Sequence, residues 1–536
     1  MGATAAVYYD LMSASFALPS SPCAAQGKRF FRRGWPLLSV ERVTRLRGVR
    51  AHAPSQVQVG DVVQLNCTKL ALGARGVCRH VSGLVVFTDA LPGEELTARV
   101  NKVKKGYAEA TKVTTLQNAL NPADPPCPHF LVCGGCNYQN LQYHAQLHAK
   151  QQQVSETLQR IGGISNCDDV LLPIIPCQQQ YHYRNNMQFT FSEAPFQQKE
   201  SSSGNCMHTR SDTAKRVVVG LHRVNNPSEV VPIEACSLQH DSANTLLQAA
   251  AQALALSPTQ PQQLSAFNPA TQRGLLRQFI LRRNSKNQYM VIVSTTSFQP
   301  ALLEPLVTAL QNCNVEILSV INTVIPLEGG MKLHHRKASK RKGSGSKRQQ
   351  YHILFGSPTI TERLCNLEFQ ISPESFFQVN SAQAEVLYNL VHKAAGLRPT
   401  DVAMDLFCGT GSIGLTLAKD CHHVYGFEST ASSVADARRN AEINGISNAT
   451  FVHGDLTKVA AVMGKQYPSP DVIVTDPARA GMSLEVIKYM QQSGARAIVY
   501  VSCNPATQAR DISQLCTGAG ARPWGNNAPR HCVITM

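Results

Sequence analysis

The sequence lacks any run of about 18 unbroken apolar residues, the length that a membrane-spanning helix requires. It also lacks a secretory signal, and its 17 cysteines are odd in number and unevenly spaced. A disulfide-rich secreted protein is therefore excluded, and reduced thiols are expected. In contrast, 43% of the 536 residues are hydrophobic, which is enough to bury several cores. These features predict a soluble globular protein of roughly three or four domains.

Acidic residues are few, because 35 Asp and Glu stand against 51 Lys and Arg, for a net charge of +16. Two segments account for most of this excess. Residues 1–55 have a net charge of +6, and the tract at 332–350 has +8 without a single acid. The remainder of the chain has a net charge of only +2. The overall charge is therefore poor support for an RNA-binding body, since it belongs to two local segments.

The first 55 residues are rich in Ala, Ser and Arg and contain only two acids, Asp10 and Glu41. This composition is typical of a transit peptide, so it predicts import into a mitochondrion or a plastid. A disordered basic leader is the alternative interpretation, and the protein would then be cytoplasmic.

Two domains are expected directly after this leader. Residues 56–116 alternate apolar and polar side chains between regularly spaced turns, which predicts a small OB-like β-barrel. Residues 117–370 predict a mixed α+β central domain. Within it, the polar tracts 193–216 and 332–350 lack hydrophobic periodicity and are interpreted as loop insertions.

Strands and helices alternate in the last domain, 371–536. A helix is expected at 381–396, capped by Asn380 or Ser381, and another at 433–445. Strands are expected at 402–407, 423–428, 449–455, 471–477 and 497–503. This alternation predicts an α/β fold with a doubly wound parallel sheet, whose ligands bind at the carboxyl ends of the strands.

Chemically capable residues recur at these strand ends. Gly409 and Gly411 follow the first strand, where they let the backbone come close to a ligand. Glu428 ends the second strand, where a carboxylate would accept both hydroxyls of a ribose. Asp455 ends the third, where it could accept from an adenine amino group, and Asp476 lies at the tip of the fourth. Acids at successive strand ends are a more specific signal than the glycines, which many α/β turns contain for packing alone.

Cys503 ends the fifth strand, directly before an expected helix. The N-terminus of a helix favours the thiolate, which is the nucleophilic form of cysteine. A buried structural cysteine is the alternative interpretation. The Asn-Pro that follows Cys503 and its place at the ligand edge favour a functional thiol.

Four motifs occur in a characteristic order: SFFQVN (375–380), DLFCGTGSIGL (405–415), DPARAG (476–481) and VSCNPAT (501–507). In combination they resemble the RNA uracil-C5 methyltransferase family, which uses S-adenosylmethionine, and the expected barrel resembles the RNA-binding TRAM domain of that family. The resemblance implies that Cys503 is the nucleophile. It also implies contacts to the methyl donor from Gln378, Phe407, Glu428, Asp455 and Asp476.

The chemistry of the family explains the need for a thiolate. Uracil C5 is too weak a nucleophile to take a methyl group from a sulfonium ion, but addition of a thiolate to C6 generates an enolate whose C5 can do so. A base then removes the C5 proton, and elimination of the thiol leaves 5-methyluridine. The uridine must leave its stack to reach Cys503, so a loop or an unfolded segment of rRNA or tRNA is the expected substrate.

A second group of thiols lies in CPHFLVCGGC (127–136), which contains Cys127, Cys133 and Cys136. Three close thiolates suit zinc or an iron–sulfur cluster, and both need a fourth ligand. Such close spacing in a glycine-containing loop is hard to explain by packing alone.

The resemblance assigns the fourth ligand. Family members with this spacing hold a 4Fe–4S cluster, and their fourth cysteine follows an aliphatic strand. The segment VVPIEACSL (230–238) matches that position and implies Cys236. Cys206 lies inside an insertion, Cys177 lacks this context, and zinc is the second choice of metal.

The sequence departs from the family at two places. Ser412 stands where the family has Asn in the glycine-rich turn. Near the end of the chain, alignment on His531 places Val533 where the family has the glutamate that acts as its base. No Asp or Glu follows Asp511. Either another group or water removes the C5 proton, or the terminus is altered, or the enzyme is impaired.

The leading hypothesis is an organellar RNA methyltransferase that acts on C5 of uridine in rRNA or tRNA. One alternative is an RNA-binding protein with a degenerate catalytic site, and another is a cytosine-C5 methyltransferase, which shares thiol addition. RNA is the expected partner, with no membrane and no obligate protein partner.

Overall fold

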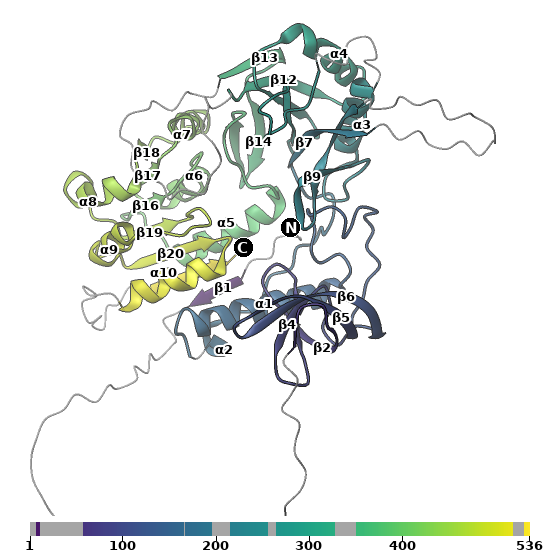
Figure 1. Cartoon of the computed structure of the whole chain (residues 1–536). Coiled ribbons are helices and arrows are strands. Elements are labelled where there is room, and N and C mark those ends of the chain that lie inside the picture. The colour runs from purple at the N-terminus through teal and green to yellow at the C-terminus, as the bar shows by residue number, and fades with distance from the viewer. Residues whose placement is uncertain are drawn as a thin grey trace, which may run out of the picture. The chain divides into compact units, whose positions relative to one another are not determined.

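The structure is a computed structural model that describes residues 7–10, 57–165, 167–195, 215–255, 264–326, 350–517 and 530–535. These residues fall into two compact units (Figure 1), of which the first is 57–122 and the second contains the rest. The first unit is a barrel, and the second contains two seven-stranded sheets. None of the helices in the described ranges combines the length and the apolar character that a bilayer crossing requires.

The barrel is closed, with the strand order β2-β3-β4-β6-β5. Its strands are β2 (Val62–Leu70), β3 (Gly76–Arg79), β4 (Val85–Thr88), β5 (Glu95–Lys104) and β6 (Tyr107–Gln117). The neighbours are antiparallel except for β4 and β6, which are parallel. Leu65 and Cys67 of β2 are buried between exposed neighbours, as the alternating pattern requires. The structure confirms the predicted OB-like barrel.

A mixed sheet with the order β13-β12-β11-β10-β7-β8-β9 forms the centre of the second unit. Its strands are β7 (Asn186–Pro195), β8 (Lys215–Arg223), β9 (Asn226–Pro232), β10 (Leu276–Arg283), β11 (Tyr289–Thr295), β12 (Ile317–Val324) and β13 (Gln350–Gly356). Helices α1 (Tyr143–Arg160) and α2 (Cys167–Val170) precede it. Helices α3 (Asp241–Ala255) and α4 (Pro300–Gln311) share a core with the sheet through Leu246 and Leu303.

The two predicted insertions are shorter than expected where their ends are described. Pro195 is the last residue of β7 and pairs with Lys215, the first residue of β8. Gln350 begins β13 and pairs with Val324 of β12. The prediction of loop structure is wrong at these ends, because backbone pairing continues beyond the alternating pattern of side chains. The intervening parts, 196–214 and 327–349, lie outside the described residues.

The C-terminal sheet has the order β1-β21-β20-β19-β16-β17-β18. Its strands are β16 (Val402–Leu406), β17 (His423–Glu428), β18 (Ala449–His453), β19 (Val472–Thr475), β20 (Ala497–Ser502), β21 (Arg530–Thr535) and β1 (Val7–Asp10). All neighbours from β16 to β21 are parallel. This confirms the predicted parallel α/β sheet, and the five expected strands match β16 to β20 within two residues.

Strand β1 is a finding that the sequence does not predict. Residues 7–10 were expected to belong to the leader, yet they pair antiparallel with β21, with Val7 opposite Thr535. Without β1, strand β21 would lie at the edge of the sheet with unpaired backbone N–H and C=O groups. The pairing with β1 satisfies these groups.

The helices of this region alternate with its strands. They are α5 (Ser381–Ala395), α6 (Ser412–Leu417), the 3₁₀ helix η2 (Ala418–Asp420), α7 (Ala431–Ile443), α8 (Leu456–Gln466), α9 (Leu484–Gln492) and α10 (Pro505–Thr517). The side chain of Asn380 caps α5 by accepting from the backbone N–H of Gln383 at 3.0 Å, as one of the two expected caps.

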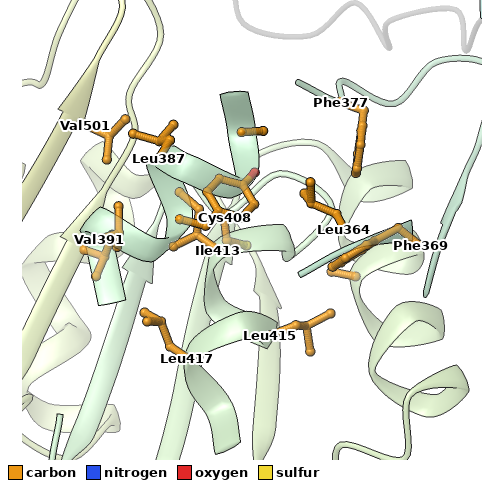
Figure 2. Packing of buried hydrophobic residues seen from close by; sticks show 14 of the residues in the cluster. Leu364, Phe369, Phe377, Leu387, Val391, Cys408, Ile413, Leu415, Leu417 and Val501 are labelled. Carbon is orange, nitrogen blue, oxygen red and sulfur yellow. The ribbon is translucent and has the colours of Figure 1, made fainter. Parts of the chain in front are cut away.

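A continuous core joins the two sheets of the second unit. The hairpin β14 (Ile360–Leu364) and β15 (Leu367–Ile371) contributes Leu364 and Phe369, α5 contributes Leu387, and β20 contributes Val501 (Figure 2). Ile321 of β12 belongs to the same core. The segment that connects the sheets, which contains the motif SFFQVN, is therefore supported from both sides.

Candidate active site

The carboxyl ends of five parallel strands meet at one edge of the C-terminal sheet. Leu406 of β16 is in register with Phe427 of β17 and Thr475 of β19, and Thr475 is in register with Tyr500 of β20. The predicted residues Phe407, Glu428, Asp455, Asp476 and Cys503 lie at or within two residues of these strand ends. The structure therefore brings them to the edge where such sheets bind ligands.

The turn after β16 has an unusual backbone. Gly409 and Gly411 have φ of +53° and +78°, a region that glycine enters readily. A Cβ on Gly411 would lie 2.8 Å from the ring of Phe451, whereas a Cβ on Gly409 would enter open space. Phe407 also has a positive φ, of +64°, which is strained for a bulky side chain. The strain and the open space at Gly409 mark the place where a ligand would approach.

Asp405 is a residue whose importance the sequence does not show by itself. It lies inside β16, is 1% exposed, and accepts from the backbone N–H of Gly414 at 2.8 Å. Its other oxygen, Oδ1, is buried without a hydrogen-bond partner. Burial raises the pKa of this carboxyl to about 8, so it is protonated at neutral pH and able to donate. The signal that could have revealed it is an acid within an otherwise apolar strand.

Glu428 ties the second strand end to the glycine-rich turn. Its Oε2 accepts from the N–H of Gly409 at 3.2 Å, and its Oε1 accepts from the N–H of Thr430 at 2.7 Å and from the Ser429 hydroxyl at 3.0 Å. The carboxylate is held in one orientation beside the turn, and Oε2 retains a lone pair for a further donor.

Asp455 has a structural task at its strand end. It is the cap of α8, where its Oδ1 accepts from the N–H of Thr457 at 3.0 Å. Lys458 lies 3.8 Å from Oδ2, and the side chain of Asp455 is 53% exposed. Its contact to adenine stays a prediction, and Lys458, the ion-pair partner of Oδ2, lies beside the oxygen that would make it.

Asp476 begins the DPARAG loop. Burial raises the pKa of its carboxyl to about 7. The loop is held against the start of α10, because the carbonyl of Arg479 accepts from Asn504 Nδ2 at 3.0 Å and from the Thr507 hydroxyl at 3.1 Å. These contacts bring the loop of Asp476 to the turn that carries the predicted nucleophile.

Cys503 is an exposed thiol between β20 and α10. The turn around it is rigid, since Asn504 Oδ1 accepts from the N–H of Ala506 at 3.1 Å and Ser502 Oγ accepts from the N–H of Asn504 at 3.0 Å. Pro505 is the first residue of α10, a position that suits proline. An exposed thiol on a fixed turn before a helix has the access and the electrostatic setting of a nucleophile.

Gln378 lies in the segment between the two sheets, and it is half-buried. Its backbone carbonyl accepts from Asn185 Nδ2 at 2.8 Å. Ser412 stands where the family has Asn, and its hydroxyl forms a hydrogen bond of 2.7 Å with the Tyr388 hydroxyl. The Ser412 side chain is thus engaged in packing α5 against α6.

The position of the missing base lies in β21. The backbone of Val533 is in register with Tyr500 of β20. The position that the resemblance gives to a glutamate therefore lies within a strand, and this chain has an apolar residue there.

The four predicted metal ligands line one cavity in the central region, of about 210 Å³. Cys127, Cys133, Cys136 and Cys236 all belong to its wall. The cysteine loop is held by the end of β8 and the residue after it, since the N–H of Gly134 donates to the carbonyl of His222 at 2.9 Å and the N–H of Val224 donates to the carbonyl of Val132 at 3.0 Å. Tertiary structure thus joins residues that are about a hundred positions apart in the sequence.

Cys177 and Cys206 are the other cysteines considered for the fourth ligand. Cys177 is absent from the cavity wall, and its thiol donates to the carbonyl of Gln179 at 3.1 Å. Cys206 lies outside the described residues. Of the candidates that the structure describes, Cys236 is the one that completes the set.

The polar side chains of the cavity wall are few. Its described residues include Arg184 and no carboxylate. Nε2 of His129 and Nε2 of Gln139, two wall residues, are buried without a hydrogen-bond partner. Burial, with smaller contributions from Cys136 and Cys127, raises the pKa of the Cys236 thiol to about 11. The thiolate form therefore needs a positive centre, such as a metal, to stabilise it.

The four thiols share a cavity wall, but they are not arranged as a metal site. Within the described part of the chain, no group of three or more His, Cys, Asp or Glu side chains is placed to hold a metal ion.

Comparisons with known proteins agree with this architecture. The tRNA (uracil-5-)-methyltransferase family matches residues 347–519. An uncharacterized RNA methyltransferase of Chlorobaculum tepidum is 32% identical over 463 residues, which cover 85% of this chain and 90% of the relative. One from Nitratidesulfovibrio vulgaris is 32% identical over 471 residues, with the same coverage of 85% and 90%.

A solved structure supports the fold. It is the tRNA (uracil-54, C5)-methyltransferase of Pyrococcus abyssi in complex with S-adenosyl-L-homocysteine, with 23% identity and a TM-score of 0.59. The match covers 84% of this chain and 92% of the archaeal protein. The sheet and its strand-end residues thus define a methyltransferase of the doubly wound α/β class. By its relatives and its motifs, the chain belongs to the RNA uracil-C5 methyltransferase family.

Proposed function

We propose that this enzyme transfers a methyl group from S-adenosylmethionine to C5 of a uridine in tRNA or rRNA. The observation that carries the proposal is the common edge of the C-terminal sheet, where the exposed Cys503 thiol and the loop of Asp476 are held together by Asn504 and Thr507. A nucleophile beside a cofactor edge is the arrangement that C5 methylation requires.

Cys503 starts the reaction. Its thiolate sulfur forms a bond to C6 of the uracil, and the electron pair of the C5–C6 bond moves toward C5 and O4. C5 then takes the methyl group from S-adenosylmethionine, and S-adenosylhomocysteine is released. Removal of the C5 proton returns the electron pair to the C5–C6 bond, and the Cys503 sulfur leaves as the thiolate.

The strand-end residues hold the methyl donor. Glu428 has a free lone pair beside the open space at Gly409, which suits a ribose hydroxyl. Phe407 and Gln378 are half-buried and suit the donor's apolar and polar parts. Asp455 offers an exposed oxygen for an adenine amino group. S-adenosylmethionine supplies the activated methyl group, and these side chains orient it.

Removal of the C5 proton, the step after methyl transfer, lacks the family's base in this chain. Val533 occupies the position of the family's base, and its backbone is paired inside the sheet. A positioned base is worth about 100- to 10,000-fold in rate, so proton removal by water should be slow by that factor.

The cysteine cavity is proposed to hold a 4Fe–4S cluster bound by Cys127, Cys133, Cys136 and Cys236. The four thiols on one cavity wall, the Arg184 cation beside them and the unpartnered amide nitrogen of Gln139 support an anionic group there. Zinc is the second choice. We assign the cluster a structural or RNA-positioning role, since methyl transfer involves no redox step.

The barrel is proposed to be a TRAM domain that binds the RNA. The hairpin at its β5–β6 turn presents Lys102, Lys104 and Lys105, all exposed, which suits phosphate groups. Import into a mitochondrion or plastid is the proposed location, from the composition of residues 1–55, and removal of such a leader would also remove β1. Fusion of residues 1–55 to a fluorescent protein tests it, and a cytoplasmic signal would contradict it.

One experiment tests the activity. The purified protein is incubated with S-adenosylmethionine carrying a labelled methyl group and with tRNA or rRNA, and the labelled nucleoside is identified after digestion. We expect 5-methyluridine, in whichever RNA is the substrate. Label in 5-methylcytidine would favour the cytosine alternative, and RNA binding without label would favour a degenerate enzyme.

A further inference from the structure

A short segment, residues 182–185, runs between the cysteine cavity and the motif that contains Gln378. It leads directly into β7, and the carbonyl of Asn185 accepts from the N–H of Arg283 at 2.7 Å, which fixes it to the central sheet. His182 and Arg184 of this segment contact the cysteine loop, whereas Asn185 contacts the motif that contains Gln378.

On one side the segment is bonded to the loop of the fourth cysteine. The N–H of His182 donates to the carbonyl of Ser237, and the N–H of Arg184 donates to the carbonyl of Leu238, both at 2.9 Å. Ser237 and Leu238 directly follow Cys236, and Arg184 belongs to the cavity wall. A change in the position of the Cys236 loop is therefore passed to Arg184 through backbone bonds.

On the other side Asn185 is bonded to the cofactor motif. Its backbone N–H donates to the carbonyl of Val379 at 2.9 Å. Its Nδ2 donates to the carbonyl of Gln378 at 2.8 Å and to the Ser381 hydroxyl at 2.9 Å. Three hydrogen bonds from one residue thus hold the segment from Gln378 to the start of α5.

Arg184 and Asn185 are consecutive residues, and the backbone N–H of each is hydrogen-bonded to a different site, to Leu238 and to Val379. We propose that Asn185 is a positioning residue, which holds Gln378 in place for the methyl donor and passes to it the state of the cysteine cavity. The inference rests on the proposed roles of Gln378 and of the four cysteines, and it names the way in which the metal site supports methyl transfer without taking part in it.

A matched pair of variants tests the positioning role. Asn185→Ala removes two side-chain hydrogen bonds to the motif. Asn284→Ala is the control, because Asn284 Nδ2 likewise donates two hydrogen bonds, to the carbonyl of Thr361 in β14 at 3.0 Å and to Gln288 Oε1 at 2.9 Å. The affinity for S-adenosylhomocysteine is measured by calorimetry, and the melting temperature is measured alongside it.

We expect Asn185→Ala to weaken binding by at most about 30-fold, the equivalent of two hydrogen bonds, because the released motif must be ordered again when the ligand binds. Asn284→Ala should leave binding within about 2-fold. Asn185→Asp should resemble Asn185→Ala, because it keeps the shape of the side chain but loses the donor. Equal losses in Asn185→Ala and Asn284→Ala, or full affinity in Asn185→Ala, would overturn the positioning role, whatever the melting temperatures.

A double-mutant cycle tests the coupling. Cys236→Ser removes a predicted ligand, its iron content is measured, and its affinity for S-adenosylhomocysteine should fall at least about 5-fold. The double variant Cys236→Ser, Asn185→Ala should bind no more weakly than Asn185→Ala alone, because the path is already broken. Losses that multiply, or a wild-type protein that holds no metal after anaerobic purification, would overturn the coupling.

These readouts are separate from the proposed activity. A protein that shows the binding pattern but forms no 5-methyluridine would refute the proposed function and retain the positioning role. A protein that methylates uridine with an unaltered affinity in Asn185→Ala would do the reverse.

Discussion

The two candidate sites of the second unit differ in how the chain builds them. The cofactor edge is made by consecutive strands, each of which delivers its residue at or near its own carboxyl end: Phe407, Glu428, Asp455, Asp476 and Cys503. The four thiols of the cysteine cavity come from a compact loop at 127–136 and from a single residue after β9, Cys236.

Because of this difference, the two sites should respond differently to amino-acid substitutions. At the cofactor edge the parallel register aligns every strand end, so each residue contributes through its own strand. In the cavity, closure depends on long-range packing, and the loss of one cysteine affects the whole group. The edge should therefore respond to substitution by losing single steps, and the cavity by losing its ligand entirely.

The largest expected effect is that of Cys503→Ala. Loss of the nucleophile should lower methylation by at least about 1,000-fold, while S-adenosylhomocysteine binding stays nearly unchanged, because the cofactor residues are on other strand ends. Cys516→Ala, at a half-buried thiol further along α10, is the control. A parallel loss of cofactor affinity in Cys503→Ala would break the view that strand ends act separately.

The same thiol should be visible as a trapped intermediate. With Val533 in place of the base, a methylated covalent adduct of protein and RNA should accumulate, because thiol elimination waits for slow proton removal. Denaturing gels with labelled RNA should show a shifted band that Cys503→Ala lacks. Fast turnover without an adduct would mean that an unidentified residue supplies the base.

The cavity should lose its ligand as a unit. Anaerobically purified protein should contain about four irons per chain, and Cys236→Ser should lower the iron content to less than half of that value. Cys313→Ser is the matched control, since its half-buried thiol lies outside the cavity wall and donates to the carbonyl of Ala309 at 3.3 Å. Stoichiometric zinc without iron in the wild type would reject the cluster.

A smaller effect concerns pH and the buried acids of the edge. Burial raises the folded-state pKa of Asp405 to about 8 and that of Asp476 to about 7, well above the ordinary value near 3.8. The folded state therefore holds these protons more tightly, and the stability they confer is lost as pH rises from about 4 through 8. Each group contributes a slope of at most about 1.4 kcal/mol per pH unit.

Urea unfolding at pH 5, 6, 7 and 8, without methyl donor, measures that slope. Asp405→Asn should flatten it, because the amide oxygen still accepts from Gly414 but no longer titrates. Asp124→Asn, at an exposed position of the same unit, should leave it unchanged. An equal slope in Asp405→Asn and wild type would mean that Asp405 does not titrate in this range.

The smallest effect is expected from the basic tract. Replacing its eight Lys and Arg by Ser keeps the length of the connection between β12 and β13. The salt dependence of RNA binding should become less steep by roughly one unit for each phosphate that the tract neutralises. The control is an equal number of Ser substitutions among its uncharged residues. An unchanged slope would show that the tract does not bind RNA.

The parallel sheet and its site were predictable because both arise from local patterns. Each strand–turn–helix unit carries its own hydrophobic period and turn residues, so strands β16 to β20 and the position of Cys503 follow from short windows of sequence. Strand β1 was not predictable, because its pairing with β21 joins residues more than five hundred positions apart and leaves no local signal.

The sequence by itself determined the class of chemistry: a thiol before Asn-Pro, acids at strand ends and a short loop of three cysteines are local features that need no partner. Tertiary structure decided the remaining connections. Tertiary packing places Cys236, and not Cys177, in the cavity wall with the other three thiols. It also buries Asp405, whose carboxyl therefore keeps a proton, and it places Asn185 against Gln378. The physical reason is that burial and long-range hydrogen bonds depend on segments far apart in the chain, whose approach is fixed only when both sheets pack on a common core.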